Sequence, residues 1–83
     1  MIYVGIDVAK DKHDCFIINS DGEILFNPFT ISNNHEGFNT LFQRIESVSD
    51  DFTTVKVGLE ATGHYSYNLL GFLLDKGLPT YVI

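Results

Sequence analysis

The sequence is short of cysteine, proline and basic residues, and each shortage excludes a class of protein or site. Its 83 residues include one cysteine, two prolines, and five Lys or Arg residues against eleven Asp or Glu residues. A single cysteine, Cys15, excludes an internal disulfide and a multi-cysteine zinc site, and it fits a reducing compartment. The net charge of −6 argues against independent, non-specific binding to nucleic acid.

Long apolar runs and a targeting signal are also missing. No stretch approaches the roughly 18 continuous apolar residues of a membrane span, so we expect a cytoplasmic protein with no membrane partner. At this length we expect one domain, residues 1–83, and a two-domain enzyme is excluded. The mean hydropathy of +0.09 indicates more apolar surface than so small a domain can hide. We therefore expect a missing neighbour or a self-partner.

Short apolar runs rich in β-branched residues predict five strands. The dipeptide Asp21-Gly22 is typical of a hairpin turn between the second and third strands. Pro28 places the third strand at an edge of the sheet, because proline cannot donate a hydrogen bond to a neighbouring strand. The predicted strands are residues 2–8, 13–19, 23–31, 53–60 and 78–83.

Two segments with helical periodicity separate the last three strands. Asn33 and Glu36 have the spacing of a capping box, and apolar residues then recur at helical intervals, which predicts a helix over 34–48. A second helix is predicted over 64–76, and Gly77 follows it where a left-handed cap is expected.

The resulting order, β-β-β-α-β-α-β, predicts a mixed five-stranded α/β sheet. Crossovers through a helix are right-handed, so the strand after each helix is expected to run parallel to the first strand. Because the sequence ends on an apolar strand, we expect a fragment of a longer protein.

Two acidic residues, Asp7 and Glu60, lie within or at the end of apolar strands. Burial of a carboxylate is costly unless it is paired, hydrogen-bonded or bound to a cation. If the two strands are parallel neighbours, both side chains emerge together near the carboxyl ends, where a divalent cation such as Mg²⁺ would relieve their repulsion. The alternative is that each carboxylate accepts hydrogen bonds from loop amides, and spacing alone does not decide between the two.

Three sequence blocks resemble a known family. They are Val-Gly-Ile-Asp-Val-Ala-Lys at 4–10, Gly-Leu-Glu-Ala-Thr-Gly-His-Tyr at 58–65, and Leu-Leu-Asp-Lys-Gly-Leu-Pro-Thr-Tyr-Val-Ile at 73–83. In this order and spacing they resemble the N-terminal domain of the DEDD-type insertion-sequence transposases, a family that includes bridge-RNA-guided recombinases. The resemblance covers essentially the whole chain.

The resemblance implies a ribonuclease H-like fold close to that of Holliday-junction resolvases. It implies that Asp7 and Glu60 are the first two acids of a catalytic Asp-Glu-Asp-Asp tetrad that holds Mg²⁺, with Mn²⁺ as a substitute. The last two acids and the family's serine nucleophile have no counterpart here, so we expect weak metal binding and no catalysis by these 83 residues. The implied setting is a prokaryotic, multimeric DNA transposase, with a guide RNA in some members.

Three residues near the two acids are candidates for nucleic-acid contact, each with an ordinary alternative. Lys10 fits a phosphate contact or a solvated turn. Thr62 fits a phosphate site at a helix start or a simple helix cap. His64 fits a substrate contact or a surface position.

Other polar or aromatic residues are interpreted as structural. We expect His13 and His35 on the surface, Cys15 in the core, and Tyr65 and Tyr67 in the core or an interface. His13, Asp14 and Cys15 are not expected to form a metal site, because consecutive residues of a strand face opposite sides.

Two other functions are compatible with the pattern. An actin-like or sugar-kinase nucleotide-binding half-domain also begins with an aspartate-bearing hairpin, but it carries Gly and Ser or Thr after the aspartate. Here the residues are Val8-Ala9-Lys10. A non-catalytic oligomerisation module would explain the apolar excess and is compatible with the transposase reading.

Overall fold

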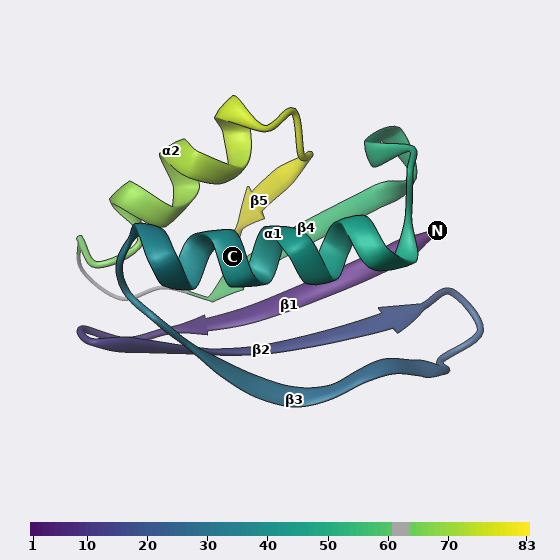
Figure 1. Ribbon diagram of the computed structural model, residues 1–83, viewed down its shortest axis with the longest axis horizontal. Helices are drawn as coiled ribbons and strands as arrows, with labels where there is room; N and C mark the ends of the chain where they lie inside the picture. The colour runs from purple at the N-terminus through teal and green to yellow at the C-terminus, as the bar shows by residue number, and fades with distance from the viewer. Residues whose placement is uncertain (61–63) are drawn as a thin grey trace.

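A computed structural model describes residues 1–60 and 64–83. A hairpin-connected meander opens the chain and two helix crossovers follow it (Figure 1). The elements are β1 (Ile2–Val8), β2 (Lys12–Asn19), β3 (Ile24–Ser32), α1 (His35–Val48), a short 3-10 helix η1 (Phe52–Thr54), β4 (Val55–Glu60), α2 (Tyr67–Asp75) and β5 (Thr80–Val82).

All five strands form one sheet in the order β3-β2-β1-β4-β5. β1 pairs antiparallel with β2 and parallel with β4, and β5 is parallel to β4, which confirms the predicted mixed sheet. β3 is an edge strand, as Pro28 predicts. The register beside Pro28 is irregular, since Cys15 pairs with Phe29 but Ile17 pairs with Phe26, so the strand bulges where proline cannot donate.

The hydrophobic core lies between one face of the sheet and the two helices (Figure 1). Along each central strand every second side chain is buried, because successive residues point to opposite faces. The helices pack against each other through Phe72 of α2, whose ring contacts Phe38 and Phe42 of α1. The sheet residues of this core are Val4, Ile6, Val8, Cys15, Ile17, Ile31, Val55, Val57 and Leu59.

The opposite face of the sheet is uncovered by the described part of the chain. Large apolar side chains on it are solvent-exposed, among them Tyr3, Phe16 and Tyr81 at 39%, 44% and 56%. Sheets with parallel strands usually have layers on both faces. Among the described residues no helix has the length and apolarity needed to cross a membrane.

Several predicted boundaries need correction. The capping-box prediction for Asn33 is wrong, because Asn34 is the N-cap of α1 and its Oδ1 accepts from the Gly37 N–H at 2.9 Å. The fourth strand begins at Val55, two residues later than predicted, because the Asp51 side chain accepts from the Thr53 N–H and caps η1. α2 begins at Tyr67, three residues later than predicted.

Both predicted turn glycines have positive φ angles, whereas only one of the two histidines predicted on the surface lies there. Gly77 ends α2 with a φ of +77°, and Gly22 turns the β2–β3 connection with a φ of +81°, both as predicted. His35 is on the surface as predicted. The surface prediction for His13 is wrong: its side chain is 0% exposed, because it faces the helices and stacks on Phe38.

Candidate functional site

Asp7 and Glu60 are directly opposite each other in the parallel pairing of β1 and β4. Val4, Ile6 and Val8 face the helices, so Asp7 faces the uncovered side of the sheet, and the same alternation along β4 turns Glu60 to that side. The structure therefore brings the two predicted carboxylates together at the carboxyl ends of neighbouring strands. Adjacent strands are about 4.8 Å apart, which is close enough for one cation to contact both side chains.

Both carboxylates are solvent-exposed, which the sequence did not indicate. Their position in apolar strands suggested burial, but in each strand the side chain points away from the helices and toward the uncovered face of the sheet. No burial cost has to be offset, and both oxygens of each group are accessible to water or to a cation. Repulsion between the two negative charges is the remaining electrostatic cost.

A third carboxylate, Asp14, extends this pair into a row. Asp14 is opposite Asp7 in the antiparallel pairing of β1 and β2, and its Oδ1 accepts a hydrogen bond from the Thr30 hydroxyl at 2.9 Å. β2, β1 and β4 thus carry Asp14, Asp7 and Glu60 side by side on the uncovered face. In the described ranges, no three His, Cys, Asp or Glu side chains converge closely enough to form a metal cage.

Sequence reasoning missed Asp14, although a signal for it was present. Residues 9–12 connect the predicted strands 2–8 and 13–19, and a hairpin symmetric about the centre of this connection places Asp14 opposite Asp7. The predicted alternation of His13, Asp14 and Cys15 between the two faces of the strand is confirmed, since Asp14 is exposed while its two neighbours are buried.

An apolar groove of about 550 Å³ adjoins the carboxylate row on the same face. Gly5 and Gly58 are paired across β1 and β4, and because they have no side chains they leave space at the bottom of the groove. The Phe16 ring lies over Gly5. A β-carbon at Gly5 would collide with that ring, so glycine is required for the ring to lie flat there. Other side chains along the groove are Tyr3, Pro28, Lys56, Tyr81 and Ile83.

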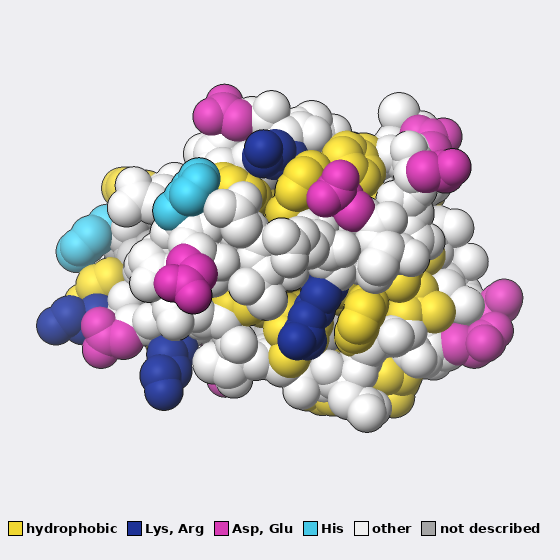
Figure 2. All heavy atoms as spheres, viewed as in Figure 1, with side chains coloured by type: hydrophobic (Ala, Val, Ile, Leu, Met, Phe, Trp, Pro, Cys, Tyr) yellow, Lys and Arg dark blue, Asp and Glu magenta, His cyan; other side chains and the backbone are white. Residues whose placement is uncertain are grey.

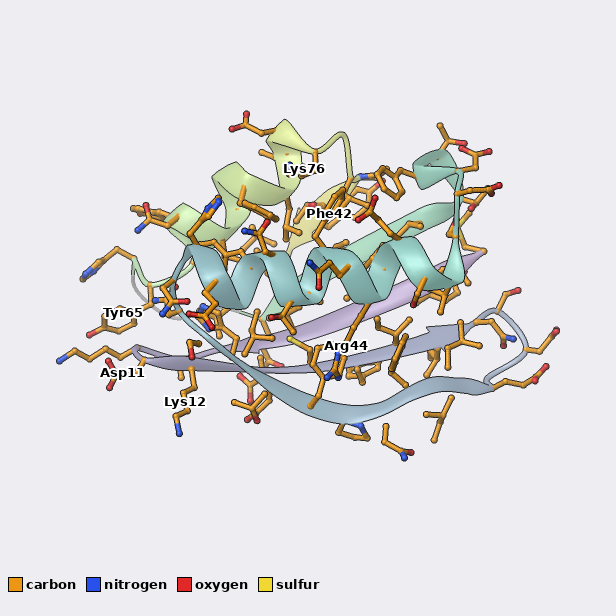
Figure 3. The ribbon with its side chains drawn as sticks, in the orientation of Figure 1. Asp11, Lys12, Phe42, Arg44, Tyr65 and Lys76 are labelled. Atoms are coloured by element: carbon orange, nitrogen blue, oxygen red, sulfur yellow. The ribbon has the colours of Figure 1, made fainter. Side chains whose placement is uncertain are left out.

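The basic side chains are distributed unevenly around the molecule. On the helical side Arg44 lies over Phe29, 4.2 Å from the ring centroid, and Lys76 lies over Phe42 at 5.0 Å (Figure 3). Lys10 and Lys12 are exposed on and beside the β1–β2 turn, at the end of the sheet where Asp7 is located. Figure 2 shows Lys or Arg and His side chains gathered at that end of the molecule.

The other predicted contact residues lie near this end or outside the described part of the chain. His64 is exposed, and its ring packs on Tyr65 at 4.7 Å between centroids. Thr62 lies outside the described residues. Tyr65 is half-buried against the core, one of the two places predicted for it. Tyr67 is 68% exposed, so of its two predicted places the core is wrong and an interface stays a prediction.

Cys15 and His13 belong to the core. Burial raises the pKa of the Cys15 thiol from 9.0 to about 12, and the negative charge of Asp14 contributes in the same direction. The thiol therefore stays protonated at neutral pH and is a poor nucleophile. The Nδ1 of His13 accepts from the Ala9 N–H at 3.3 Å, which fixes the ring beside the β1–β2 turn.

Comparisons with solved structures show which fold this is. RuvC from Thermus thermophilus superposes with a TM-score of 0.62 at 14% identity, covering 100% of this chain and 63% of the RuvC chain. T. thermophilus RuvC in complex with a Holliday junction substrate gives 0.61 at 14% identity, with 100% and 64% coverage. The Pelota protein of Thermoplasma acidophilum gives 0.56 at 10% identity, with 100% and 27% coverage.

These identities establish the fold alone, and this chain spans less than two thirds of the RuvC length. The mixed five-stranded sheet with its two helices is ribonuclease H-like, as the sequence resemblance implied. A comparison with curated protein sequences found no significant match. The sequence profile of the IS110-type DEDD transposases, described as transposase, matches residues 4–83. The chain therefore belongs to this transposase family.

Proposed function

We propose that this chain is the N-terminal, metal-binding part of the catalytic domain of a DNA transposase or recombinase that moves an insertion sequence. The observation that carries the proposal is the register of β1 and β4, which sets Asp7 directly opposite Glu60. Family membership supplies the expectation that these are the first two acids of the tetrad. The shared fold of the RuvC–Holliday junction complex supports DNA as the substrate class.

The donor set fits Mg²⁺, with Mn²⁺ as a substitute. Mg²⁺ is a hard cation that prefers oxygen ligands, commonly uses one or two carboxylates, and retains several waters. Asp7 and Glu60 offer accessible carboxylate oxygens on rigid, adjacent strands, and Asp14 adds negative charge beside them. Two carboxylates without further protein ligands should bind weakly, in the millimolar range.

When bound, the cation would polarise a scissile phosphate and stabilise charge that develops on its oxygens. The residues of this chain would then have separate roles. Asp7 and Glu60 fix the cation at the sheet end, and Lys10, Thr62 and His64 contact DNA phosphates beside it. The rest of the tetrad and the nucleophile would come from elsewhere in a longer protein, so these 83 residues alone are inactive.

The distribution of charge supports a DNA contact confined to one end of the molecule. The net charge of −6 disfavours a broad nucleic-acid surface, but Lys10 and Lys12 are exposed near Asp7. A phosphate brought to the cation would meet these two lysines, which flank the exposed Asp11 in the turn. We further propose a cytoplasmic, prokaryotic, multimeric protein that contacts DNA, and in some settings a guide RNA, through its full-length form.

Electron paramagnetic resonance of Mn²⁺ tests the metal assignment. Free Mn²⁺ gives a sharp six-line signal that diminishes on binding, so a titration yields the affinity. Asp7→Asn and Glu60→Gln should each weaken binding at least about tenfold, because each removes one of two ligands. Glu46→Gln, an exposed acid on α1, is the control and should leave the affinity unchanged. Equal binding by all four proteins would show that the acidic surface attracts Mn²⁺ non-specifically.

A second candidate function, an oligomerisation module, is favoured by the uncovered apolar face. Tyr3, Phe16 and Tyr81 are large, exposed and gathered along one groove. Exposed apolar patches of this kind commonly mark interaction surfaces. Sedimentation equilibrium of the wild type and of Phe16→Ser would test it: a reversible dimer lost in the variant supports the module, and a monomer at all concentrations excludes self-association.

A further inference from the structure

Asn33 joins three segments at the end of the sheet where Asp7 and Glu60 are located. It lies between β3 and α1, and its backbone N–H donates to the carbonyl of Asp11 at 2.9 Å. Its side-chain Nδ2 donates to the carbonyl of Lys10 at 2.9 Å and to the carbonyl of Tyr65 at 3.4 Å. Lys10 follows Asp7 by three residues, and Tyr65 follows Glu60 by five. The Asn33 amide is therefore shared between the segments that continue from the two strands.

Asp7 and Glu60 are the last pair of the β1–β4 register among the described residues. Val8 and the β1–β2 turn follow on one side, and on the other side the described residues resume at His64. Over residues 1–60 and 64–83, Asn33 is the one side chain that hydrogen-bonds to both the β1–β2 turn and the segment after Glu60. Figure 3 shows Asp11, Lys12 and Tyr65 at the same end of the molecule.

The chemistry of this junction requires a donor with two hydrogens. Both partners of Nδ2 are carbonyl oxygens, and a primary amide nitrogen can donate one hydrogen to each. The opposite orientation of the amide would place Oδ1 against these oxygens. In the orientation present, Oδ1 is buried and has no hydrogen-bond partner among the described atoms. The two hydrogen bonds donated by Nδ2 therefore come at the cost of leaving Oδ1 without a partner among the described atoms.

We propose that Asn33 is a positioning residue of the Asp7–Glu60 site. By tying the turn after Asp7 to Tyr65, it steadies the end of the β1–β4 pairing where the two carboxylates lie, and it fixes the place of Lys10. The metal-dependent part of this role rests on the function proposed above. The junction of the two segments stands on the hydrogen bonds alone.

The test compares three variants of the 83-residue chain with the wild type. Asn33→Ala removes the amide. Asn33→Asp keeps its shape, removes both donors, and adds a negative charge that would by itself attract cations more strongly. Asn34→Ala is the matched control, because it removes the helix-capping hydrogen bond to Gly37 from the neighbouring residue without touching either segment. If Asn33→Ala does not fold, Asn33→Ser, which keeps one donor, replaces it.

Mn²⁺ affinity, measured from the paramagnetic resonance signal, is the first readout. We expect both Asn33 variants to bind Mn²⁺ about tenfold more weakly than the wild type, the usual size of an outer-shell effect. The Asn34 variant should bind as the wild type does. A loss in Asn33→Asp, despite its added charge, excludes a simple electrostatic effect. Wild-type affinity in both Asn33 variants would overturn the proposal, as would an equal loss in Asn34→Ala.

Metal-free amide spectra are the second readout and separate this proposal from the proposed function. Asn33→Ala should shift the amide signals of Asp7, Lys10 and Glu60, whereas Asn34→Ala should shift signals at the start of α1. If the wild type binds no Mn²⁺, the metal assignment fails, and these spectra alone decide whether Asn33 positions the two strand ends. Unmoved Asp7 and Glu60 signals in Asn33→Ala would then overturn it.

Discussion

Replacing Asp7 with Asn should stabilise the metal-free chain, because Asp7 is the middle carboxylate of three. Asp14 and Glu60 are its direct partners on the adjacent strands. Two unit charges 5–6 Å apart in water repel by about 0.7 kcal/mol, so two neighbours contribute about 1.5 kcal/mol before screening. With partial screening, we expect Asp7→Asn to raise the free energy of unfolding by about 1 kcal/mol in low-salt buffer, a rise in Tm of about 4–8 °C.

Salt and Mg²⁺ provide the controls for this prediction. At 1 M salt the screening length falls to about 3 Å, so the gain should largely disappear. Millimolar Mg²⁺ should raise the Tm of the wild type but not of Asp7→Asn, because only the former retains both ligands. Glu46→Gln should change the Tm little under any of these conditions. Urea titrations that show Asp7→Asn to be less stable than the wild type, or a gain that does not depend on salt, would refute the reasoning.

Three further predictions concern the core, the thiol and catalysis. Gly37→Ala should destabilise the fold strongly, because the added β-carbon would collide with the Ser32 carbonyl. The added β-carbon of Gly71→Ala would meet no other atom, so this change should stabilise α2 by up to about 1 kcal/mol. Urea titrations of both variants check these two expectations. The Cys15 thiol ionises more easily in the unfolded chain, so stability should fall as pH rises from 9.0 toward about 12, and Cys15→Ala should remove that part of the slope in urea titrations over this range. Branched DNA incubated with the 83-residue chain and Mg²⁺ should remain uncut on a gel, and any cleavage lost in Asp7→Asn would contradict the expected inactivity.

The sheet could be predicted from the sequence because its signals are local. Continuous or alternating apolar residues define each strand, Pro28 marks an edge, and the helix crossovers make β4 and β5 parallel to β1. The juxtaposition of Asp7 and Glu60 also needs β1 and β4 to be neighbours, which the sequence left open and the order β3-β2-β1-β4-β5 shows. Their exposure did not follow, because the phase of each strand relative to the helices depends on packing.

The errors fall where two neighbouring residues compete or where tertiary contacts decide. Asn33 and Asn34 both suit a helix cap. Asn34 is the residue that caps α1, whereas the Asn33 side chain donates to the Lys10 carbonyl, which is distant in sequence. A lone histidine near a turn resembles a surface residue, yet the alternation of β2 turns His13 inward beneath Phe38. Asp14 was not predicted as part of the site, because it is seven residues from Asp7 in sequence and becomes its neighbour only through the pairing of β1 and β2.

A Mg²⁺ titration followed by amide NMR tests the central claim most directly, because it reports every residue separately. The account predicts saturable shifts confined to the amides around Asp7 and Glu60, with a smaller response at Asp14 and millimolar affinity. Shifts scattered over the acidic surface, or none near these two strands, would contradict it and leave Asp7 and Glu60 as structural acids at the ends of their strands.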